Sequence, residues 1–455
     1  MNKKHVMIVG GGVSGLSAAF FLSRRASREH LPLKITVLEA SNRFGGVLRT
    51  LACEDLRMEA GADAFYAGSK DDVMDLCREL DLLDDLIEAA PCFRHFFSVK
   101  NKKPYPIPGL PGSFGDALRL LSHSRLRFPT KCRLFGEPFI PRRKEKGDES
   151  LADFIRRRLG QGFFREFVKP LVRGVYMMDP ETMSLEAAFP RLRQAEKTCG
   201  SLAASFLNKK SEKDSPKFFT LKQGLEGLIR ALERELGQCE LRLSTPVRQC
   251  AFRKGWEIFL ENGEAMHVDS LFLAMNACDA AQLLSGNAPE LSGGLSGIRY
   301  DSIATVNLIY RAEDMPSGGW DLGFLVPMRG DPFPFSSLKW LGPSADGKTF
   351  ALRAFLSEAM IPGLFSEADE VLQQKIRNFL SDSCGIQAKP LCFSAQRYPN
   401  ALPQYETGHF ERVARIEKRV LQYPGLHLTG NGFRGFGITD CIHQARVVAS
   451  SHQFR

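Results

Sequence analysis

The chain has 455 residues, 44% of them hydrophobic, with 61 Lys and Arg against 52 Asp and Glu and a formal net charge of +9. This length predicts two or three domains rather than one simple core. The small positive excess without a recognised nucleic-acid module argues against a nucleic-acid-binding protein, and no apolar run approaches the ~18 residues of a membrane-spanning helix.

The first predicted elements are a strand over 6–9, a glycine-rich turn over 10–15 and a helix over the following stretch, LSAAFFLSRRA. Gly10, Gly12 and Gly15 have the spacing G-x-G-x-x-G, which carries a strand into a helix beneath the diphosphate of a bound dinucleotide. A glycine-rich turn without a ligand is the weaker interpretation, because a second strand and an acidic residue follow. Diphosphate contacts are therefore expected from Gly10, Gly11, Gly12, Val13, Ser14 and Gly15.

The second predicted strand, KITVLEA, carries Glu39 near its end, 24 positions beyond Gly15. A carboxylate at this place can accept hydrogen bonds from a ribose 2′-OH, and its charge argues against a 2′-phosphate, so FAD or NAD is expected. The next residues, ASNRFGG, add Arg43 and a second glycine pair. This extension, [DE]-x-x-x-R-x-G-G, resembles the segment that contacts FAD in glutathione-reductase-like flavoproteins, and the resemblance favours FAD.

Further along, a helix is predicted over 69–87, where Val73, Leu76, Leu80 and Leu83 keep one apolar face. Residues 91–206 are expected to be mostly helical after a proline-rich turn, KPYPIPGLPG, with Ser150 as a helix N-cap. The charged stretch over 208–217 predicts an exposed linker.

Much of the positive excess lies between residues 118 and 146, where nine basic side chains stand against two glutamates. Leucine and phenylalanine residues alternate with these charges. Such a segment is typical of a patch that rests on anionic lipid, and equally of an ordinary basic helical domain. Both interpretations stay open at the level of the sequence.

The second half of the chain predicts a strand and helix over 218–237, then strands with an Asn-Gly hairpin turn, the last of which, SLFLAM, returns to the nucleotide sheet. An antiparallel sheet with a helix near 366–383 is expected to cover a substrate, and a strand over 425–432 and a helix over 440–451 close the first domain. The predicted fold is α/β. It combines a Rossmann-like, glutathione-reductase-type FAD-binding domain (1–90, 207–279 and 406–455), a helical, membrane-associating domain (91–206) and a mixed-sheet substrate domain (280–405).

The eleven cysteines are scattered without a C-x-x-C pair. This usage predicts reduced thiols in a cytoplasmic protein, with neither a disulfide framework nor a metal site. A strand is predicted to begin within the first six residues, and no signal peptide is expected.

Several segments are similar to the protoporphyrinogen oxidases, a family that includes coproporphyrinogen III oxidases and belongs to the flavin amine oxidase superfamily. They are TGNGFRGFGITDCIHQA, FPRLRQAEKTCGSL, ALPQYETGHF, LVRGVYMMDPETMSLEAAFP and LGFLVP, in the family's order along the whole chain. Within ETGHF, His409 is expected to have a hydrogen-bonding rather than a catalytic role.

The resemblance implies the six-electron oxidation of protoporphyrinogen IX to protoporphyrin IX in haem biosynthesis, with FAD as cofactor and O2 as the usual acceptor. The protein would mainly hold the tetrapyrrole against the flavin, so no catalytic residue and no metal are expected. The alternatives are coproporphyrinogen III, an amine or isoprenoid substrate of the same superfamily, or a flavin-fold scaffold without activity. By likeness to the family, the protein is expected to be a homodimer. The cysteine usage predicts a cytoplasmic protein, the basic segment a peripheral contact with an anionic membrane surface, and no nucleic acid is expected to bind.

The resemblance also assigns the remaining site residues. Beside Glu39, the flavin contacts would be Ala40, Arg43, Val47, Gly61, Ala62, Asp63, Ala64, Val247 at the adenine, and Phe436, Gly437 and Ile438 under the ring system. For the substrate, Leu322 and Leu325 would form apolar walls and Arg94 would bind a propionate, with Lys100 or Arg173 as the alternative anchor.

Overall fold

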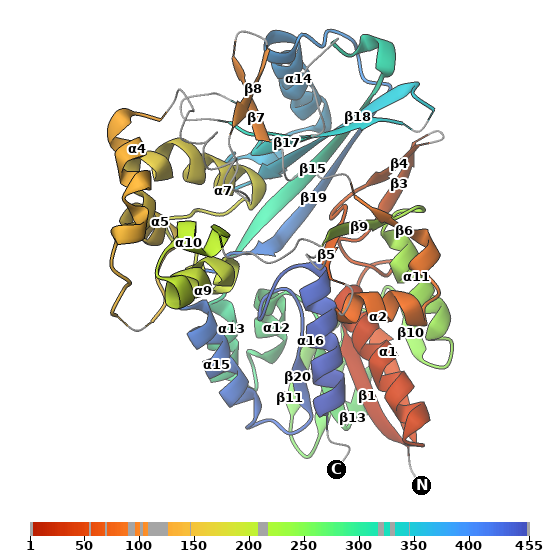
Figure 1. The fold of residues 1–455 in the computed structure, drawn as a ribbon. Coiled ribbons are helices and arrows are strands. Elements are labelled where there is room, and N and C mark those ends of the chain that lie inside the picture. The colour runs from red at the N-terminus through yellow and green to blue at the C-terminus, as the bar shows by residue number, and fades with distance from the viewer. Residues whose placement is uncertain are drawn as a thin grey trace.

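A computed structural model describes residues 3–53, 56–68, 71–89, 96–100, 103–107, 126–145, 147–207, 217–316, 323–327, 333–344 and 346–452. Within these residues, a five-stranded parallel sheet and a seven-stranded mixed sheet organise the chain. The two sheets lie at opposite ends of the molecule, and both described ends of the chain lie beside the parallel sheet (Figure 1). The α/β class and the Rossmann-like sheet are thereby confirmed.

The parallel sheet is assembled from strands that are far apart in the sequence. Val6 of its central strand pairs with Ile35 on one side and with Ser270 on the other, so the predicted return of SLFLAM to this sheet is confirmed. In spatial order its strands are β10 (Glu240–Arg242), β2 (Leu33–Leu38), β1 (Lys4–Val9), β14 (Ser270–Leu273) and β20 (Leu426–Leu428).

Each face of the parallel sheet is covered by its own layer, so its strands are buried apolar runs. The first layer comprises α1 (Val13–Arg28), α2 (Asp72–Glu79), α11 (Glu226–Glu235) and α16 (Ile438–Ser451). The predicted helix over 69–87 thus ends at Glu79, and Asp81 has a positive φ of 57°. The second layer comprises the meander β11 (Val247–Phe252), β12 (Trp256–Leu260) and β13 (Ala265–Val268), and the helices α12 (Ala277–Leu284), α13 (Pro289–Ser296) and α15 (His409–Val420).

The mixed sheet separates an apolar face from a polar one. Its order is β19 (Cys392–Pro403), β15 (Tyr300–Arg311), β18 (Thr349–Ser357), β17 (Ser337–Pro343), β16 (Gly323–Leu325), β7 (Phe96–Lys100) and β8 (Lys103–Ile107). Leu338, Leu352 and Val306 pack in the cluster that contains residues of the predicted helix α14 (Asp369–Phe379). Their strand neighbours Lys339, Arg353 and Asn307 point to the opposite face, because side chains alternate along a strand.

The proline-rich stretch after residue 100 differs from its prediction. Residues 103–107 form β8, the terminal strand of the mixed sheet, instead of a turn. Pro104 and Pro106 are tolerated there because an edge strand leaves one side of its backbone without a partner strand.

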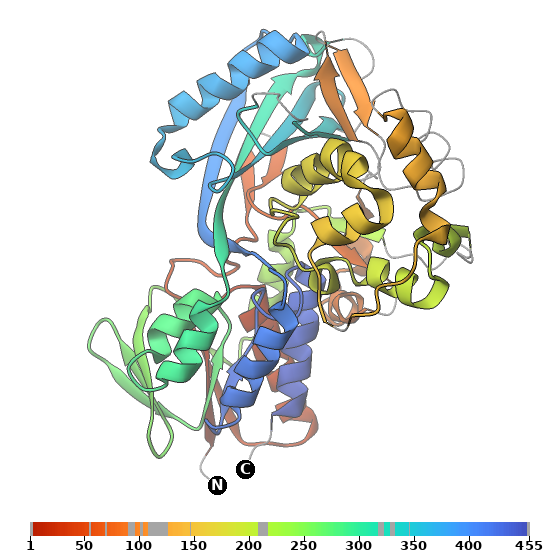
Figure 2. The same cartoon turned by 90° about the vertical axis from the view of Figure 1, so that its left-hand side faces the viewer.

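A helical layer lies across the mixed sheet from α14 (Figure 2). Its elements are α4 (Phe128–Phe135), α5 (Leu151–Leu159), α6 (Gln161–Phe163), a π-helical turn (Phe164–Val168), α7 (Lys169–Val175), α8 (Leu185–Ala188), α9 (Pro190–Cys199) and α10 (Leu202–Leu207). The predicted N-cap is confirmed, since Ser150 Oγ accepts a hydrogen bond of 3.0 Å from the backbone N of Asp153. No helix in the described residues is long and apolar enough to cross a bilayer.

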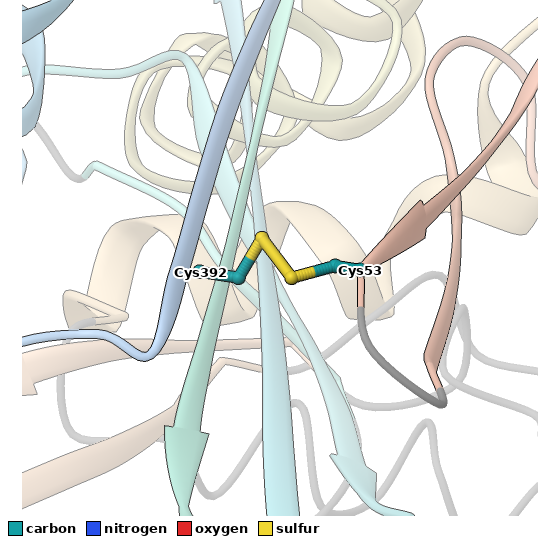
Figure 3. The surroundings of a disulfide bond; sticks show 2 residues. All are labelled: Cys53 and Cys392. Atoms are coloured by element: carbon teal, nitrogen blue, oxygen red, sulfur yellow. A yellow bond between two sulfur atoms is a disulfide. The ribbon is translucent and has the colours of Figure 1, made fainter.

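Two smaller sheets connect these layers, namely β3 (Thr50–Cys53) with β4 (Leu56–Glu59), and β5 (Phe65–Ala67) with β9 (Lys217–Leu221) and β6 (Leu86–Glu88). At the tip of the first, Cys53 forms a disulfide with Cys392 of β19 (Figure 3). The prediction that all cysteines are reduced is therefore wrong for this pair. Their sequence separation of 339 residues gives no local signal, because only the packing of the hairpin on the mixed sheet brings them together.

Candidate cofactor and substrate site

The turn between β1 and α1 contains glycines of two kinds. A methyl group on Gly15 would lie 1.9 Å from the carbonyl oxygen of Gly10, so this glycine allows the helix to approach the strand. A methyl group on Gly12 would meet no atom within 4 Å. The space above Gly12 is therefore open, as the approach of a diphosphate to this backbone requires.

Two helix N-termini meet at this open space. α1 and α16 run side by side in the same direction (Figure 1), and a side-chain hydrogen bond joins Ser14 to Cys441 in their first turns. α1 has no side-chain cap and no acidic residue in its first turn. Its free backbone N–H groups and the positive ends of both helix dipoles therefore provide donors for an anionic group.

Glu39 lies beside the same turn. Its Oε2 accepts a hydrogen bond of 2.7 Å from the backbone N of Gly11, and its Oε1 accepts one of 2.8 Å from the backbone N of Ser41. The backbone N of Thr245 donates to the carbonyl of Glu39, which brings the predicted adenine contact Val247 close to it. Ala40 is exposed next to them.

Arg43 organises the second glycine pair from within. Its guanidinium donates to the carbonyl oxygens of Phe44 at 2.9 Å and of Leu48 at 3.2 Å, and also to that of Gly46. A bridge between Gly12 and Gly45 joins this loop to the first turn. Arg43 therefore acts as an internal brace that fixes the loop backbone.

Val47 continues the site toward the mixed sheet. Its side chain is 41% exposed, which is unusual for a valine beside a tightly packed core. A methyl group on Gly61 would lie 2.1 Å from the carbonyl oxygen of Val47, so the segment 61–64 follows directly against this loop.

The segment 59–63 lies on the polar face of the mixed sheet. Asn307 Nδ2 donates to the carbonyl of Glu59 at 3.1 Å, and Thr305 Oγ1 donates to the carbonyl of Ala60. Asp63 forms ion pairs with Lys339 and, at 3.3 Å, with Arg353. Burial alone would raise the pKa of the Asp63 carboxyl, but the two cations hold it below its ordinary value.

This charged cluster was missed by sequence reasoning. Lys339 and Arg353 are directly opposite each other on β17 and β18. The available signal in the sequence was one basic residue within each of two apolar strands. This signal does not identify the carboxylate that pairs with the two cations. Asp63 was predicted to contact the flavin. In the structure its carboxylate also joins the segment 59–63 to strands β17 and β18 of the mixed sheet.

The closing loop, residues 431–437 directly before α16, borders the same site. Phe436 and Gly437 are half-buried just before α16, and Ile438 is buried at its first position. Thr439 Oγ1 donates to the carbonyl of Tyr66 at 2.7 Å, which ties the start of α16 to the strand that follows Asp63. The predicted contacts at 47, 61–64 and 436–438 are thus brought together around one place.

One buried polar atom supports a ligand here. Tyr398 Oη is buried and has no hydrogen-bond partner among the described residues. Burial raises the pKa of the Tyr398 hydroxyl, while the cations of Arg43, Arg49 and Arg353 act in the opposite direction. Tyr398 is therefore within electrostatic reach of both the Arg43 loop and the mixed sheet. Together with the open turn at Gly12, these groups fit an extended dinucleotide.

The structure supports the predicted substrate-binding residues less than it supports the predicted cofactor contacts. Arg94 and Leu322 lie outside the described residues. Leu325 is fully buried in the core cluster under α14, whereas its neighbour Phe324 faces the helical layer. The wall role of Leu325 stays a prediction, and Phe324 is the better placed of the two. Arg173 on α7 is half-buried, and no partner for it is found among the described residues.

Comparison with known proteins adds a second line of observation. The sequence pattern of the family described as "Flavin containing amine oxidoreductase" matches residues 13–451. Coproporphyrinogen III oxidase from Bacillus subtilis is 28% identical and covers 98% of this chain and 97% of its own. Protoporphyrinogen oxidase from Homo sapiens is 27% identical over 98% of each chain. A crystal structure from Exiguobacterium sp. 255-15, provisionally named a protoporphyrinogen oxidase, has a TM-score of 0.85 at 28% identity and 99% coverage of both chains.

Proposed function

The chain belongs to the family of flavin-containing amine oxidoreductases, and on this basis we propose that it uses bound FAD to oxidise a porphyrinogen to a porphyrin. FAD supplies the acceptor for two electrons at a time. The protein's own contribution is to bind the cofactor, exclude water and orient the macrocycle. Relatives of near-identical length that are named for porphyrinogen substrates support this proposal.

The observation that carries the proposal is the apolar seam at the flavin end of the site. Phe436 of the closing loop and Phe96 and Phe355 of the mixed sheet are half-buried and pack against the core of the helical layer. A flat apolar macrocycle needs such aromatic walls, whereas a small amine does not. The cofactor cradle and this seam meet at the same loop.

The substrate is proposed to be protoporphyrinogen IX, with coproporphyrinogen III as the second candidate. The second candidate is favoured by the relatives from Bacillus subtilis and Staphylococcus aureus, which are both named coproporphyrinogen III oxidases. The test is anaerobic addition of each porphyrinogen to the purified holoprotein in parallel cuvettes. Bleaching of the flavin with rising porphyrin fluorescence supports the proposal, and an unchanged flavin band with both compounds refutes it.

Arg173 is proposed to bind a propionate of the substrate, as a second candidate in addition to Arg94. It lies next to Gly174, where a methyl group would come 3.2 Å from the carbonyl oxygen of Ser336, so α7 is close to the mixed sheet at this point. We expect Arg173→Ala to raise KM about tenfold with little change in the flavin spectrum, because loss of one charged hydrogen bond weakens binding by about 1.5 kcal/mol or more. Arg230→Ala, on the exposed face of α11, is the control. An unchanged KM would assign the anchor to another cation.

Peripheral association with an anionic membrane is proposed for α4 and the turn after it. Phe128, Phe135 and Phe139 are 78%, 67% and 89% exposed, and Arg127 and Arg133 are exposed beside them. Exposed aromatic groups flanked by cations are typical of interfacial contact. Flotation with anionic vesicles is expected to fail for Phe128→Ser/Phe139→Ser and to persist for Leu421→Ser, whose leucine is 82% exposed elsewhere. Equal flotation of both variants would refute this role.

O2 as the acceptor, a homodimeric assembly and a cytoplasmic location are retained as parts of this proposal. Peroxide formation during turnover tests the acceptor, and sedimentation of the holoprotein tests the assembly. The sedimentation result is independent of the substrate assay, whereas the peroxide measurement accompanies turnover.

A further inference from the structure

The segment ALPQYETGHF has no role in the proposed chemistry, yet it forms a junction between three parts of the molecule. The backbone N of Ser184, in the helical layer, donates to the carbonyl of Tyr405 at 2.7 Å. The backbone N of Gly408 donates to Asp148 Oδ2 at 3.0 Å, also in that layer. The segment itself comprises the end of β19 in the mixed sheet, the connection after it and the first two residues of α15.

Tyr405 holds the closing loop at two points. Its hydroxyl donates to the carbonyl of Asn431 at 2.7 Å and accepts a hydrogen bond of 3.0 Å from the backbone N of Gly435. Its ring meets the ring of Phe436 edge-on, with centroids 5.5 Å apart. The side chain is 1% exposed, so water cannot replace these hydrogen bonds without a rearrangement.

His409 holds the loop at a third point between the other two. Its Nε2 lies 2.8 Å from the carbonyl oxygen of Phe433, and its ring stacks on Tyr405 with centroids 3.8 Å apart. Burial lowers the pKa of the imidazole to about 4, so the ring is neutral at pH 7 and donates its Nε2 proton to this carbonyl. Its Nδ1 is buried and has no partner among the described residues, which leaves the Phe433 contact as its anchoring bond.

We propose that Tyr405 and His409 are positioning residues that fix the loop 431–437 against the flavin. They hold the carbonyls of Asn431 and Phe433 and the N–H of Gly435, in a loop where Gly435 has a φ of +121°, a conformation that glycine tolerates and other residues rarely adopt. The proposal rests on the proposed function in one respect, namely that Phe436, Gly437 and Ile438 face the isoalloxazine.

The first test is Tyr405→Phe, which keeps the ring and removes the hydroxyl. We expect FAD to dissociate about tenfold faster or more, and the flavin absorption band and reduction potential of the holoprotein to change. The matched control is Tyr310→Phe, because Tyr310 is fully buried under α14 and its hydroxyl has no partner in the part of the chain that the structure describes. A purely structural role would lower the melting temperature of the apoprotein and leave the flavin band and potential unchanged, and that result would overturn the proposal.

A second pair of variants separates positioning from folding. His409→Gln keeps a donor near the position of Nε2, whereas His409→Leu has none. FAD affinity is expected to be largely retained in the first and reduced about tenfold in the second, and equal affinities would overturn the role of His409. If the wild-type protein binds FAD but oxidises no porphyrinogen, the proposed function fails, while these flavin measurements still decide this inference.

Discussion

The two kinds of glycine in the opening turn allow the cofactor site to be separated from the fold by matched substitutions. Gly12→Ala adds a methyl group where no atom lies within 4 Å, at a residue with φ −75° and ψ −177° that alanine adopts readily. Because Gly12 is the N-cap of α1, where alanine is less favourable than glycine, we expect the free energy of unfolding of the apoprotein to fall by only about 0.5–1 kcal/mol. The methyl group would, however, occupy the space that a diphosphate needs.

Gly15→Ala is expected to behave in the opposite way. Its methyl group would lie 1.9 Å from the oxygen and 3.1 Å from the carbon of the Gly10 carbonyl, which is backbone and cannot rotate away. Helix α1 must then move from the sheet, and overpacking of this kind destabilises by about 1–3 kcal/mol, with the upper end expected here.

The assay combines urea unfolding of each apoprotein with FAD titration followed by flavin fluorescence. Gly12→Ala should weaken FAD binding at least about tenfold, equivalent to about 1.4 kcal/mol, with nearly normal stability. Gly293→Ala is the control, because Gly293 lies on α13 and its methyl group would also meet no atom within 4 Å. Normal FAD affinity in Gly12→Ala would refute the placement of the diphosphate over this glycine.

Three further predictions concern charge, pH and the disulfide. Glu39→Arg should release FAD because it removes the acceptor beside Gly11, and an unchanged flavin content after gel filtration would contradict the ribose role. Burial lowers the folded-state pKa of His409 from 6.5 to about 4, so this residue binds fewer protons in the folded protein than in the unfolded chain. Its contribution to the free energy of unfolding is fully present above about pH 6.5 and is lost by about 1.4 kcal/mol per pH unit toward pH 4, and His427 and His452, whose pKa values burial also lowers, act in the same direction. Urea unfolding that is unchanged or stronger at pH 5 would contradict this sign. In the wild-type protein, alkylation should detect two fewer thiols before reduction than after it. Cys53→Ser should abolish this difference and lower the free energy of unfolding by about 2–4 kcal/mol, whereas Cys132→Ser, at an exposed free thiol, should leave both the difference and the stability unchanged.

The cofactor half of the site was accessible to sequence reasoning because its residues act through local spacing. The turn at 10–15 and Glu39 belong to one strand–helix–strand unit, whose geometry is nearly fixed by its chain length. Even there, the structure adds that the Arg43 side chain folds back on its own loop carbonyls.

The substrate side of the site depends on which face of the mixed sheet each strand residue points to, and the sequence does not decide this. Leu325 and Phe324 are both apolar and adjacent, so the pattern does not say which of them faces the helical layer. The pairing of β16 with β7 and β17 decides it, and β7 comes from a segment that composition had assigned to helices.

By itself, the sequence determined the dinucleotide turn and the acid beside it, since both belong to one strand–helix–strand unit. Only the tertiary structure decided that Asp63 meets Lys339 and Arg353, that Cys53 meets Cys392, and that Tyr405 and His409 hold the closing loop. The physical reason is that the first two contacts join residues hundreds of positions apart. The contacts of Tyr405 and His409 span helix α15 and strand β20, whose packing brings the closing loop back to these residues. Their existence depends on which faces the sheets bury, and side-chain periodicity specifies that a face is buried without specifying what covers it.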